Sequence, residues 1–266
     1  MTLLQVLILA VLQGLTEFLP VSSSAHLALA EHFMKGFSDP GLAFEVVVHL
    51  GTLVAVFVYF RKDFAALLGF GQKSVFSGHE QRALLYVVAA SVPTGILGLA
   101  LRGAATRAFE SPLIVGIGLL ITGTALWCAE RFSRPVAGMD GMTWRHALLI
   151  GTAQGIAVFP GVSRSGSTIA AGLFAGLDRN LAFTFSFILS VPAILGATAL
   201  EARHIAEAAA HPGDLPLYAV AFAVAGATGY ATLALLRRAV TALRLTFFAY
   251  YCFALGAIAV TMALAG

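Results

Sequence analysis

Six long stretches of apolar residues run through the chain, and each is long enough to cross a lipid bilayer as a helix. The hydrocarbon core of a bilayer is about 30 Å thick, which a helix of roughly 20 apolar residues spans. The stretches lie near 41–60, 83–101, 112–129, 181–200, 216–236 and 245–265. This pattern predicts six full transmembrane helices and places the chain in the all-α class of polytopic integral membrane proteins.

Two further apolar regions are too short to span and are interrupted by Pro, Gly and Ser. Residues 3–19 and 146–159 each run into such a cluster, after which a second short apolar piece follows. Irregular backbone at membrane depth occurs only where protein or a cavity surrounds it. Because each half of these segments is too short to cross the bilayer, the chain is expected to enter, turn at the break and return to the same side. We therefore predict two re-entrant helix–turn–helix pairs beside the six spans.

The composition excludes an ordinary soluble domain. Charged residues make up 11% of the 266 residues, against about 25% in soluble domains, and the mean hydropathy is +0.90. A net charge of +3 would suggest a nucleic-acid partner in a soluble chain, but the positive charge of cytoplasmic loops is sufficient cause here, so none is expected. Cys128 and Cys252 lie in apolar runs and are interpreted as small hydrophobic residues without a disulfide. The scattered Phe residues are interpreted as lipid-facing.

The distribution of Lys and Arg predicts the orientation in the membrane. Six crossings put both termini on one side and four loops (61–82, 130–145, 178–180 and 237–244) on the other. These loops carry eleven Lys and Arg, which are Arg61, Lys62, Lys73, Arg82, Arg131, Arg134, Arg145, Arg179, Arg237, Arg238 and Arg244. The opposite face carries four, namely Lys35, Arg102, Arg107 and Arg203, and Arg164 lies in the second broken segment. Because the face rich in Lys and Arg is normally cytoplasmic, both termini are predicted outside.

The two broken segments resemble each other when the chain is shifted by 141 positions. QGLTEFLPVSSSAH (13–26) then aligns without gaps with QGIAVFPGVSRSGS (154–167), with six identities in 14 positions. Each copy precedes three crossings, an odd number, so the second half must be inverted relative to the first. We expect a single domain, 1–266, with repeats at about 1–130 and 146–266, whose breaks meet near the midplane as in many transporters.

Polar residues concentrate in these breaks, and the second one has the features of a phosphate site. An arginine at membrane depth costs at least about 2.5–3.5 kcal/mol unless an anion compensates it, and Arg164 lies at the start of a helix. Backbone N–H groups at a helix N-terminus and an arginine fork both bind phosphate oxygens. The predicted diphosphate-binding residues are Arg164, Ser163, Ser165, Gly166, Thr168 and Ser22. The alternative is that these residues cap helix ends while Arg164 pairs with Glu17.

The first break contains candidates for metal binding and catalysis. Gln13 and Glu17 are four residues apart on one helix face, where their oxygens could hold a divalent cation such as Mg²⁺ or Ca²⁺; alternatively, Glu17 merely neutralises Arg164. Ser23 and His26 are three residues apart, which would bring an imidazole within reach of a hydroxyl, as nucleophilic catalysis requires.

One more pair of ionisable residues lies in the first full span. Glu45 and His49 share a helix face near its outer end. Ionisable residues within a span are functional candidates by default. The alternative, which the sequence leaves equally open, is that they extend to the interface or bond to one another.

Two motifs in the breaks resemble those of a known family. The motif E/Q-x-x-x-E is satisfied by Gln13 and Glu17, and PGxSRSxxT is satisfied by Pro160, Gly161, Ser163, Arg164, Ser165 and Thr168. With its length and hydropathy, the chain resembles the bacterial undecaprenyl-diphosphate phosphatases, the bacitracin-resistance proteins. The resemblance implies removal of the terminal phosphate of undecaprenyl diphosphate for recycling of the peptidoglycan lipid carrier. It also implies a divalent metal, an inverted repeat, the bacterial inner membrane and a site open to the periplasm.

The mechanism expected on this basis uses Ser23, His26, Glu17 and Arg164 as catalytic residues. Ser23 attacks the terminal phosphorus, His26 carries the proton, Arg164 holds the phosphates, and Glu17 with Gln13 positions the metal. Ser22 is the rival nucleophile, and direct attack by water is the rival route. The competing class is a transporter or lipid flippase, which would share the topology but need no nucleophile. The sequence leaves the oligomeric state open, a homo-oligomer included.

Overall fold

The structure is a computed structural model that describes residues 1–34, 42–71, 73–134, 136–202, 215–242 and 244–265. Within these ranges all regular structure is helical, apart from one isolated bridge between Ala137 and Leu177. The helices are α1 (Leu3–Thr16), α2 (Ser23–Phe33), α3 (Leu42–Tyr59), α4 (Arg61–Leu67), α5 (Glu80–Phe109), α6 (Pro112–Phe132), α7 (Trp144–Ile156), α8 (Arg164–Phe174), α9 (Arg179–Leu200), α11 (Leu215–Ala242) and α12 (Thr246–Ala265), with a short 3₁₀ turn η1 (Met139–Gly141). The predicted all-α class is confirmed.

The predicted spans correspond to helices of the structure. Among the described residues, α5, α6, α9, α11 and α12 are each long and apolar enough to cross a membrane. The sixth predicted span is α3, which the structure continues through a 71° bend into α4. This bend falls at Phe60, directly before the charged residues 61–63 that end the apolar run. Lys35 and Arg203, which entered the orientation argument, lie outside the described residues.

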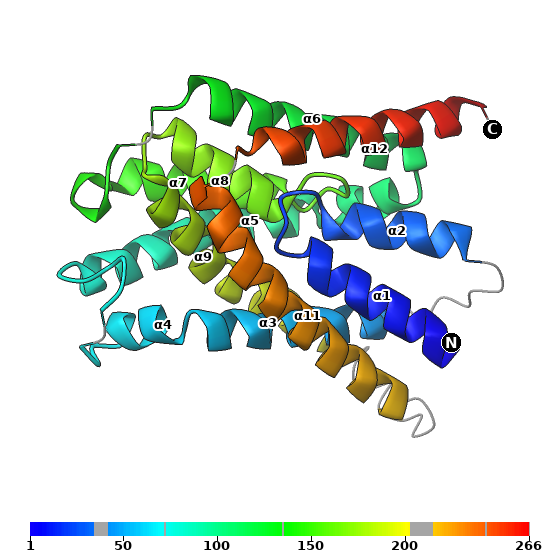
Figure 1. The fold of residues 1–266 in the computed structure, drawn as a ribbon, viewed down its shortest axis with the longest axis horizontal. Helices are drawn as coiled ribbons and strands as arrows, with labels where there is room; N and C mark the ends of the chain where they lie inside the picture. Colours follow the sequence, from blue (N-terminus) through cyan, green and yellow to red (C-terminus); the bar gives the residue numbers. More distant parts are fainter. Residues whose placement is uncertain (35–41, 72, 135, 203–214, 243, 266) are drawn as a thin grey trace.

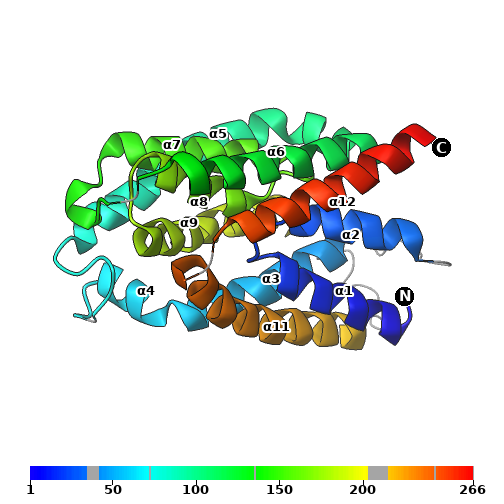
Figure 2. The same ribbon diagram turned by 45° about the horizontal axis from the view of Figure 1, so that its top comes forward.

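Both broken segments form helix–turn–helix pairs, as predicted. α1 begins with a capping box between Thr2 and Gln5, ends at Thr16, and turns into α2 at Ser23. α7 turns into α8 in the same way between Ile156 and Arg164. The start of α1 and the end of α12 lie at the same end of the molecule (Figure 1). α1 and α2 come from that end and α7 and α8 from the opposite one, so that their turns meet in the middle (Figure 2).

Small residues hold the two pairs close to the long helices. α1 packs on α11, α7 packs on α5, and α6 packs on α12. A Cβ placed on Gly151 of α7 would lie 2.1 Å from the carbonyl oxygen of Ala90 in α5, so only glycine permits this approach. Gly14 of α1 also lies close to the backbone of α11, because a Cβ there would lie 2.8 Å from the carbonyl oxygen of Ala225. These contacts fix where the two turns sit.

The core corrects the interpretation of the phenylalanines as lipid-facing. Seven of them are fully buried, namely Phe18, Phe44, Phe60, Phe76, Phe183, Phe185 and Phe187. Phe18, in the first break, packs edge-on against Phe187 of α9 with ring centroids 5.6 Å apart. Periodicity could not reveal this, because α9 is apolar all round and is buried inside the bundle rather than at its surface. Cys128 and Cys252 are free, as expected.

Candidate active site

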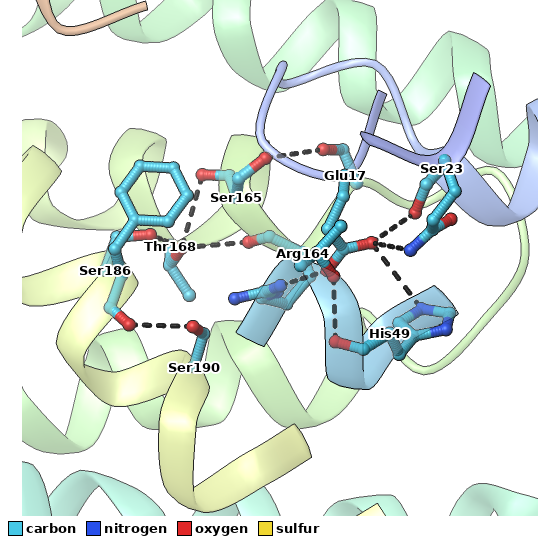
Figure 3. A network of polar contacts seen from close by, with 12 residues as sticks. Glu17, Ser23, His49, Arg164, Ser165, Thr168, Ser186 and Ser190 are labelled. Atoms are coloured by element: carbon cyan, nitrogen blue, oxygen red, sulfur yellow. Dashed lines mark hydrogen bonds and ion pairs between the residues drawn. The ribbon is translucent and has the colours of Figure 1, made fainter. Parts of the chain in front are cut away.

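Glu17 lies in the turn after α1, at the point where the two breaks meet. The residue is only 8% exposed, and each of its carboxylate oxygens is bonded. Gln13 Nε2 donates to Oε2 over 3.0 Å, and Ser23 Oγ donates to the same oxygen over 2.6 Å. Arg164, the first residue of α8, donates to Oε1 (Figure 3). The carboxylate therefore bonds within the first break through two hydrogen bonds and joins it to the second through one ion pair.

Arg164 shows that the two predictions for its partner are compatible. Its Nη2 forms the ion pair with Glu17 that the alternative interpretation proposed. Its Nη1, however, is buried without a hydrogen-bond partner among the described residues. A buried donor of this kind is costly unless a ligand or water satisfies it. Arg164 also borders a cavity, so an ion pair with Glu17 and a role in binding a ligand do not exclude each other.

The hydroxyls of the second break bond to its own helix start, to the first break and to α9. Ser163 caps α8 by accepting from the Gly166 N–H over 3.1 Å, and Ser165 donates to the Leu19 carbonyl over 3.2 Å. Thr168 bonds to Ser186 of α9, also in Figure 3. Ser165, Gly166 and Thr168 do not border the cavity, which reaches Ser163, Arg164 and Ser22. Only half of the predicted diphosphate-binding set therefore faces the space where a ligand fits.

Thr122 of α6 is part of this turn, although the sequence analysis did not single it out. Its hydroxyl donates to the Gly161 carbonyl and accepts from the Ser163 N–H, both over 2.9 Å. Gly161 itself has φ +86°, a left-handed conformation that favours glycine. Because Thr122 takes the Ser163 N–H, fewer backbone donors remain for phosphate than the Gly/Ser-rich sequence indicated. No motif marks Thr122, which lies 39 residues from Gly161.

The expected contact between Ser23 and His26 is wrong. His26 Nδ1–H donates to the carbonyl of Ser22 over 2.7 Å, and Nε2 lies 2.7 Å from the hydroxyl of Tyr251 in α12. The two rings stack with centroids 5.6 Å apart. Ser23 instead donates to Glu17. The spacing of three residues was compatible with contact, but α12 offers His26 a partner on the other side, which the sequence could not indicate.

His49 is the histidine that lies beside Glu17, whereas the sequence analysis expected His26 to lie beside Ser23. Its Nε2 lies 3.5 Å from Glu17 Oε2, and its Nδ1–H donates to the backbone carbonyl of Glu45 over 2.7 Å. Figure 3 shows His49 beside Glu17, and its side chain is 32% exposed and borders the cavity. Features of both alternatives are present, since His49 bonds to the Glu45 backbone and also lies beside Glu17.

A cavity of about 620 Å³ extends from the breaks along α5 and α9. Glu17, Ser23, His49 and Arg164 border what we call its inner end, and Arg102 and Glu201 border its outer end. The wall between the ends is mostly apolar and includes Gly95, Gly98, Leu99, Ala193 and Ala197. This volume is typical of pockets that bind small molecules. A few charged groups at the end of an apolar cavity suit an amphipathic ligand with an anionic head.

The described residues contain no group of three or more His, Cys, Asp or Glu side chains that could hold a metal ion. The predicted pair, Gln13 and Glu17, remains suitable as two hard oxygen ligands. Gln13 Oε1 is buried without a partner, while its amide nitrogen points at Glu17. Rotating the amide by 180° would bring Oε1 beside the carboxylate in exchange for the hydrogen bond that Nε2 donates to Glu17. The donor set therefore fits a hard divalent cation, provided that a ligand supplies the other positions.

Fold and site together define a polytopic membrane protein whose buried serine–carboxylate–arginine cluster opens into an apolar cavity. Comparison with known families agrees: the sequence model of the bacitracin resistance protein BacA family matches residues 6–258. The chain belongs to this family, which confirms the resemblance inferred from the two motifs.

Curated relatives match over nearly the whole length. An undecaprenyl-diphosphatase from Desulfosudis oleivorans is 43% identical over 273 residues, which cover 96% of both chains. One from Syntrophotalea carbinolica is 40% identical over 96% of this chain and 97% of the relative. One from Gemmatimonas aurantiaca is 41% identical over 89% of each.

Proposed function

We propose that this protein hydrolyses undecaprenyl diphosphate to undecaprenyl phosphate and inorganic phosphate, which recycles the lipid carrier of peptidoglycan synthesis. The observation that carries the proposal is the unit formed by Ser23, Glu17 and Arg164 at the inner end of an apolar cavity. In this unit the Ser23 hydroxyl is hydrogen-bonded to a base, Glu17, and Arg164 has a nitrogen, Nη1, that can bind an anion. The names of the relatives and the family support the same substrate, and bacitracin resistance follows from it.

The nucleophile in this proposal is Ser23, activated by Glu17. Ser23 Oγ attacks the terminal phosphorus while its proton passes to Glu17, 2.6 Å away. The bond between that phosphorus and the bridging oxygen breaks, and undecaprenyl phosphate leaves with the oxygen. Arg164 stabilises the charge on the transferred phosphoryl group. After Glu17 has passed that proton on, water attacks the phosphoserine and gives a proton to Glu17. Glu17 returns this proton to the Ser23 oxygen as the bond between phosphorus and that oxygen breaks, which releases inorganic phosphate and restores Ser23.

His49 replaces His26 as the proton carrier. It is 3.5 Å from Glu17 Oε2 and borders the cavity, so a proton taken by Glu17 has a short way to solvent. His26 has both ring nitrogens bonded elsewhere and instead supports the turn that presents Ser23. That turn needs support, because Ser22 has φ +67°, an uncommon conformation for a residue other than glycine.

A divalent cation, Mg²⁺ or Ca²⁺, would be held by Gln13 and Glu17. When bound, it would neutralise charge on the diphosphate oxygens. The unpartnered Oε1 of Gln13 supports this assignment. Gln13→Glu adds a negative charge and should lower the metal concentration needed for half-maximal activity, whereas Gln13→Ala should raise it. Equal metal dependence in both variants would contradict the assignment.

The site opens to the periplasm, and both termini are periplasmic, in the orientation that we propose. It follows from the eleven Lys and Arg on the opposite face, and the common position of α1 and α12 at one end supports it. We also propose that residues 1–130 and 146–266 form an inverted repeat. The pairing of α1 with α11 and of α7 with α5 supports this, because each break packs on the corresponding helix of the other half.

Phosphate release from undecaprenyl diphosphate by the detergent-purified protein tests the function. Release should require Mg²⁺ or Ca²⁺, stop with EDTA, and fall at least about 100-fold in Ser23→Ala and Arg164→Ala. Labelled phosphate should be trapped on the wild type and not on Ser23→Ala. Normal turnover by Ser23→Ala would favour direct attack by water. No release by folded wild-type protein would favour the transporter class.

A further inference from the structure

The cavity has a second ion pair at its outer end, away from Glu17 and Arg164. Arg102 of α5 donates to a carboxylate oxygen of Glu201, which directly follows α9. The Arg102 side chain is 47% exposed, and the Glu201 side chain is 15% exposed. The more accessible end of the cavity therefore carries an arginine with a carboxylate counter-ion, as its buried end does.

One face of α5 leads from the outer arginine to the inner end. Gly95, Gly98, Leu99 and Arg102 follow one another at helical spacing and all border the cavity. A Cβ placed on Gly95 or Gly98 would meet no atom within 4 Å, so this face borders open space. Across the cavity, α9 contributes Ala193 and other small residues. An anionic head has a continuous path between the two arginines, while the apolar walls suit the chain attached to it.

We propose that Arg102 captures the diphosphate head of the lipid at the outer end of the cavity, and that Glu201 occupies the arginine until the substrate replaces it. This inference rests on the proposed function, because it concerns the same substrate. A guanidinium binds phosphate through two parallel hydrogen bonds, and a diphosphate carries more charge than one carboxylate. Arg102 is the exposed partner of the pair, with 47% of its side chain accessible, so an incoming anion can reach the guanidinium from the outer end of the cavity. The head then moves inward to Arg164.

The alternative is that Arg102 and Glu201 simply tie α5 to α9. The two interpretations predict different effects of the two substitutions on substrate binding. If the pair is only a structural tie, neutralising either partner has the same effect, because either change breaks the ion pair. Under the capture proposal, removing Arg102 removes the binding group, whereas removing Glu201 removes its competitor.

Steady-state hydrolysis of undecaprenyl diphosphate by the full chain distinguishes them. Arg102→Gln should raise KM roughly tenfold, the loss expected for a hydrogen bond to a charged group, and leave kcat within about twofold. Glu201→Gln should lower KM and make inorganic phosphate a stronger competitive inhibitor. Arg107→Gln is the matched control, because Arg107 lies on the same helix but outside the cavity lining, and KM should not change.

A binding measurement separates this proposal from the function on which it rests. In a Ser23→Ala background, the rise in unfolding temperature caused by the same lipid should shrink with Arg102→Gln and grow with Glu201→Gln. The capture proposal is wrong if Arg102→Gln and Glu201→Gln raise KM and weaken lipid binding to the same extent. It is also wrong if neither substitution changes KM or binding. If the wild type binds the lipid without releasing phosphate, the hydrolase function is wrong, and the binding contrast still decides on Arg102.

Discussion

Glu17 accepts hydrogen bonds from Gln13, Ser23 and Arg164 while almost completely buried. A buried carboxylate is costly unless it is paired and hydrogen-bonded. Here the partners come from both breaks, so the same charge that would activate Ser23 also holds α8 against α1. Chemistry and local stability therefore depend on one side chain. Arg164 depends on it in turn, since its positive charge would otherwise lie uncompensated in the middle of the molecule.

Neutralising Glu17 should damage both properties. Glu17→Gln should lower kcat by at least about 100-fold, because Ser23 loses its base, and should destabilise the protein by about 3–5 kcal/mol, because Arg164 loses its counter-ion. The double variant Glu17→Gln/Arg164→Met should recover stability without recovering activity. Kinetics and thermal unfolding in detergent measure the two effects. A Glu17→Gln variant of normal stability would mean that the pair contributes nothing to the fold.

The two histidines should differ in their effect on pH dependence. If His49 carries the proton away from Glu17, His49→Gln should lower kcat and change the shape of the kcat–pH profile, because a group that transfers the proton helps to set that shape. His26→Gln should lower kcat by the same factor at every pH, because it disturbs the turn at Ser22. The profiles of both variants against the wild type decide this. If only the His26→Gln variant had a kcat–pH profile of changed shape, His26 and not His49 would be the proton carrier.

At the scale of helices, the breaks keep their positions because glycine faces a neighbouring backbone. Gly151 of α7 approaches the Ala90 carbonyl in α5, and Gly14 of α1 approaches the Ala225 carbonyl in α11. Helices in membranes associate through close packing of this kind, since lipid is as apolar as their side chains. The short helices α1 and α7 are thereby attached to full spans, which holds their polar turns inside the bundle.

A larger side chain at one of these contacts should displace a break. Gly151→Leu would place a Cβ 2.1 Å from the Ala90 oxygen, so α7 must move away from α5, and both the unfolding temperature and kcat should fall. Gly103→Ala on α5 is the control, because its Cβ would meet no atom within 4 Å and alanine favours a helix. Thermal unfolding and turnover of both variants test this. A Gly151→Leu variant with normal values would show that the close contact is dispensable.

For the whole molecule, the charge distribution and the common position of the termini should together set its orientation. The loops around α4 and η1 and the end of α11 are on one side, and the start of α1 and the end of α12 are on the other (Figures 1 and 2). Because Lys and Arg favour the cytoplasm, the cavity's outer end faces the periplasm in this arrangement.

Reporter fusions in a Gram-negative host test that orientation. Alkaline phosphatase attached after α12 should be active, since it folds only outside the cytoplasm, and a fluorescent protein at the same place should be dark. Fusions truncated after Phe132, at the end of α6, should show the reverse pattern. Fluorescence from the fusion after α12 would invert the orientation and place the cavity on the cytoplasmic side.

The sequence was sufficient for the class, the spans, the two breaks and the family. Hydrophobic length is a local property, so a bilayer-spanning helix can be recognised without its neighbours. The residues of the breaks were also recognisable, because charged side chains such as Arg164 and Glu17 are costly at membrane depth and occur there mainly where they are paired or functional. The pairing of those two residues was one of the alternatives that the sequence allowed.

Only the tertiary structure decided what each polar group contacts. Ser23 bonds to Glu17, His49 approaches the same carboxylate, and His26 turns to Tyr251. These contacts join residues on different helices, and helical spacing restricts only which side chains share a face of one helix. The partner across the gap depends on how α3 and α12 pack, which is a property of the assembled bundle and not of any single segment.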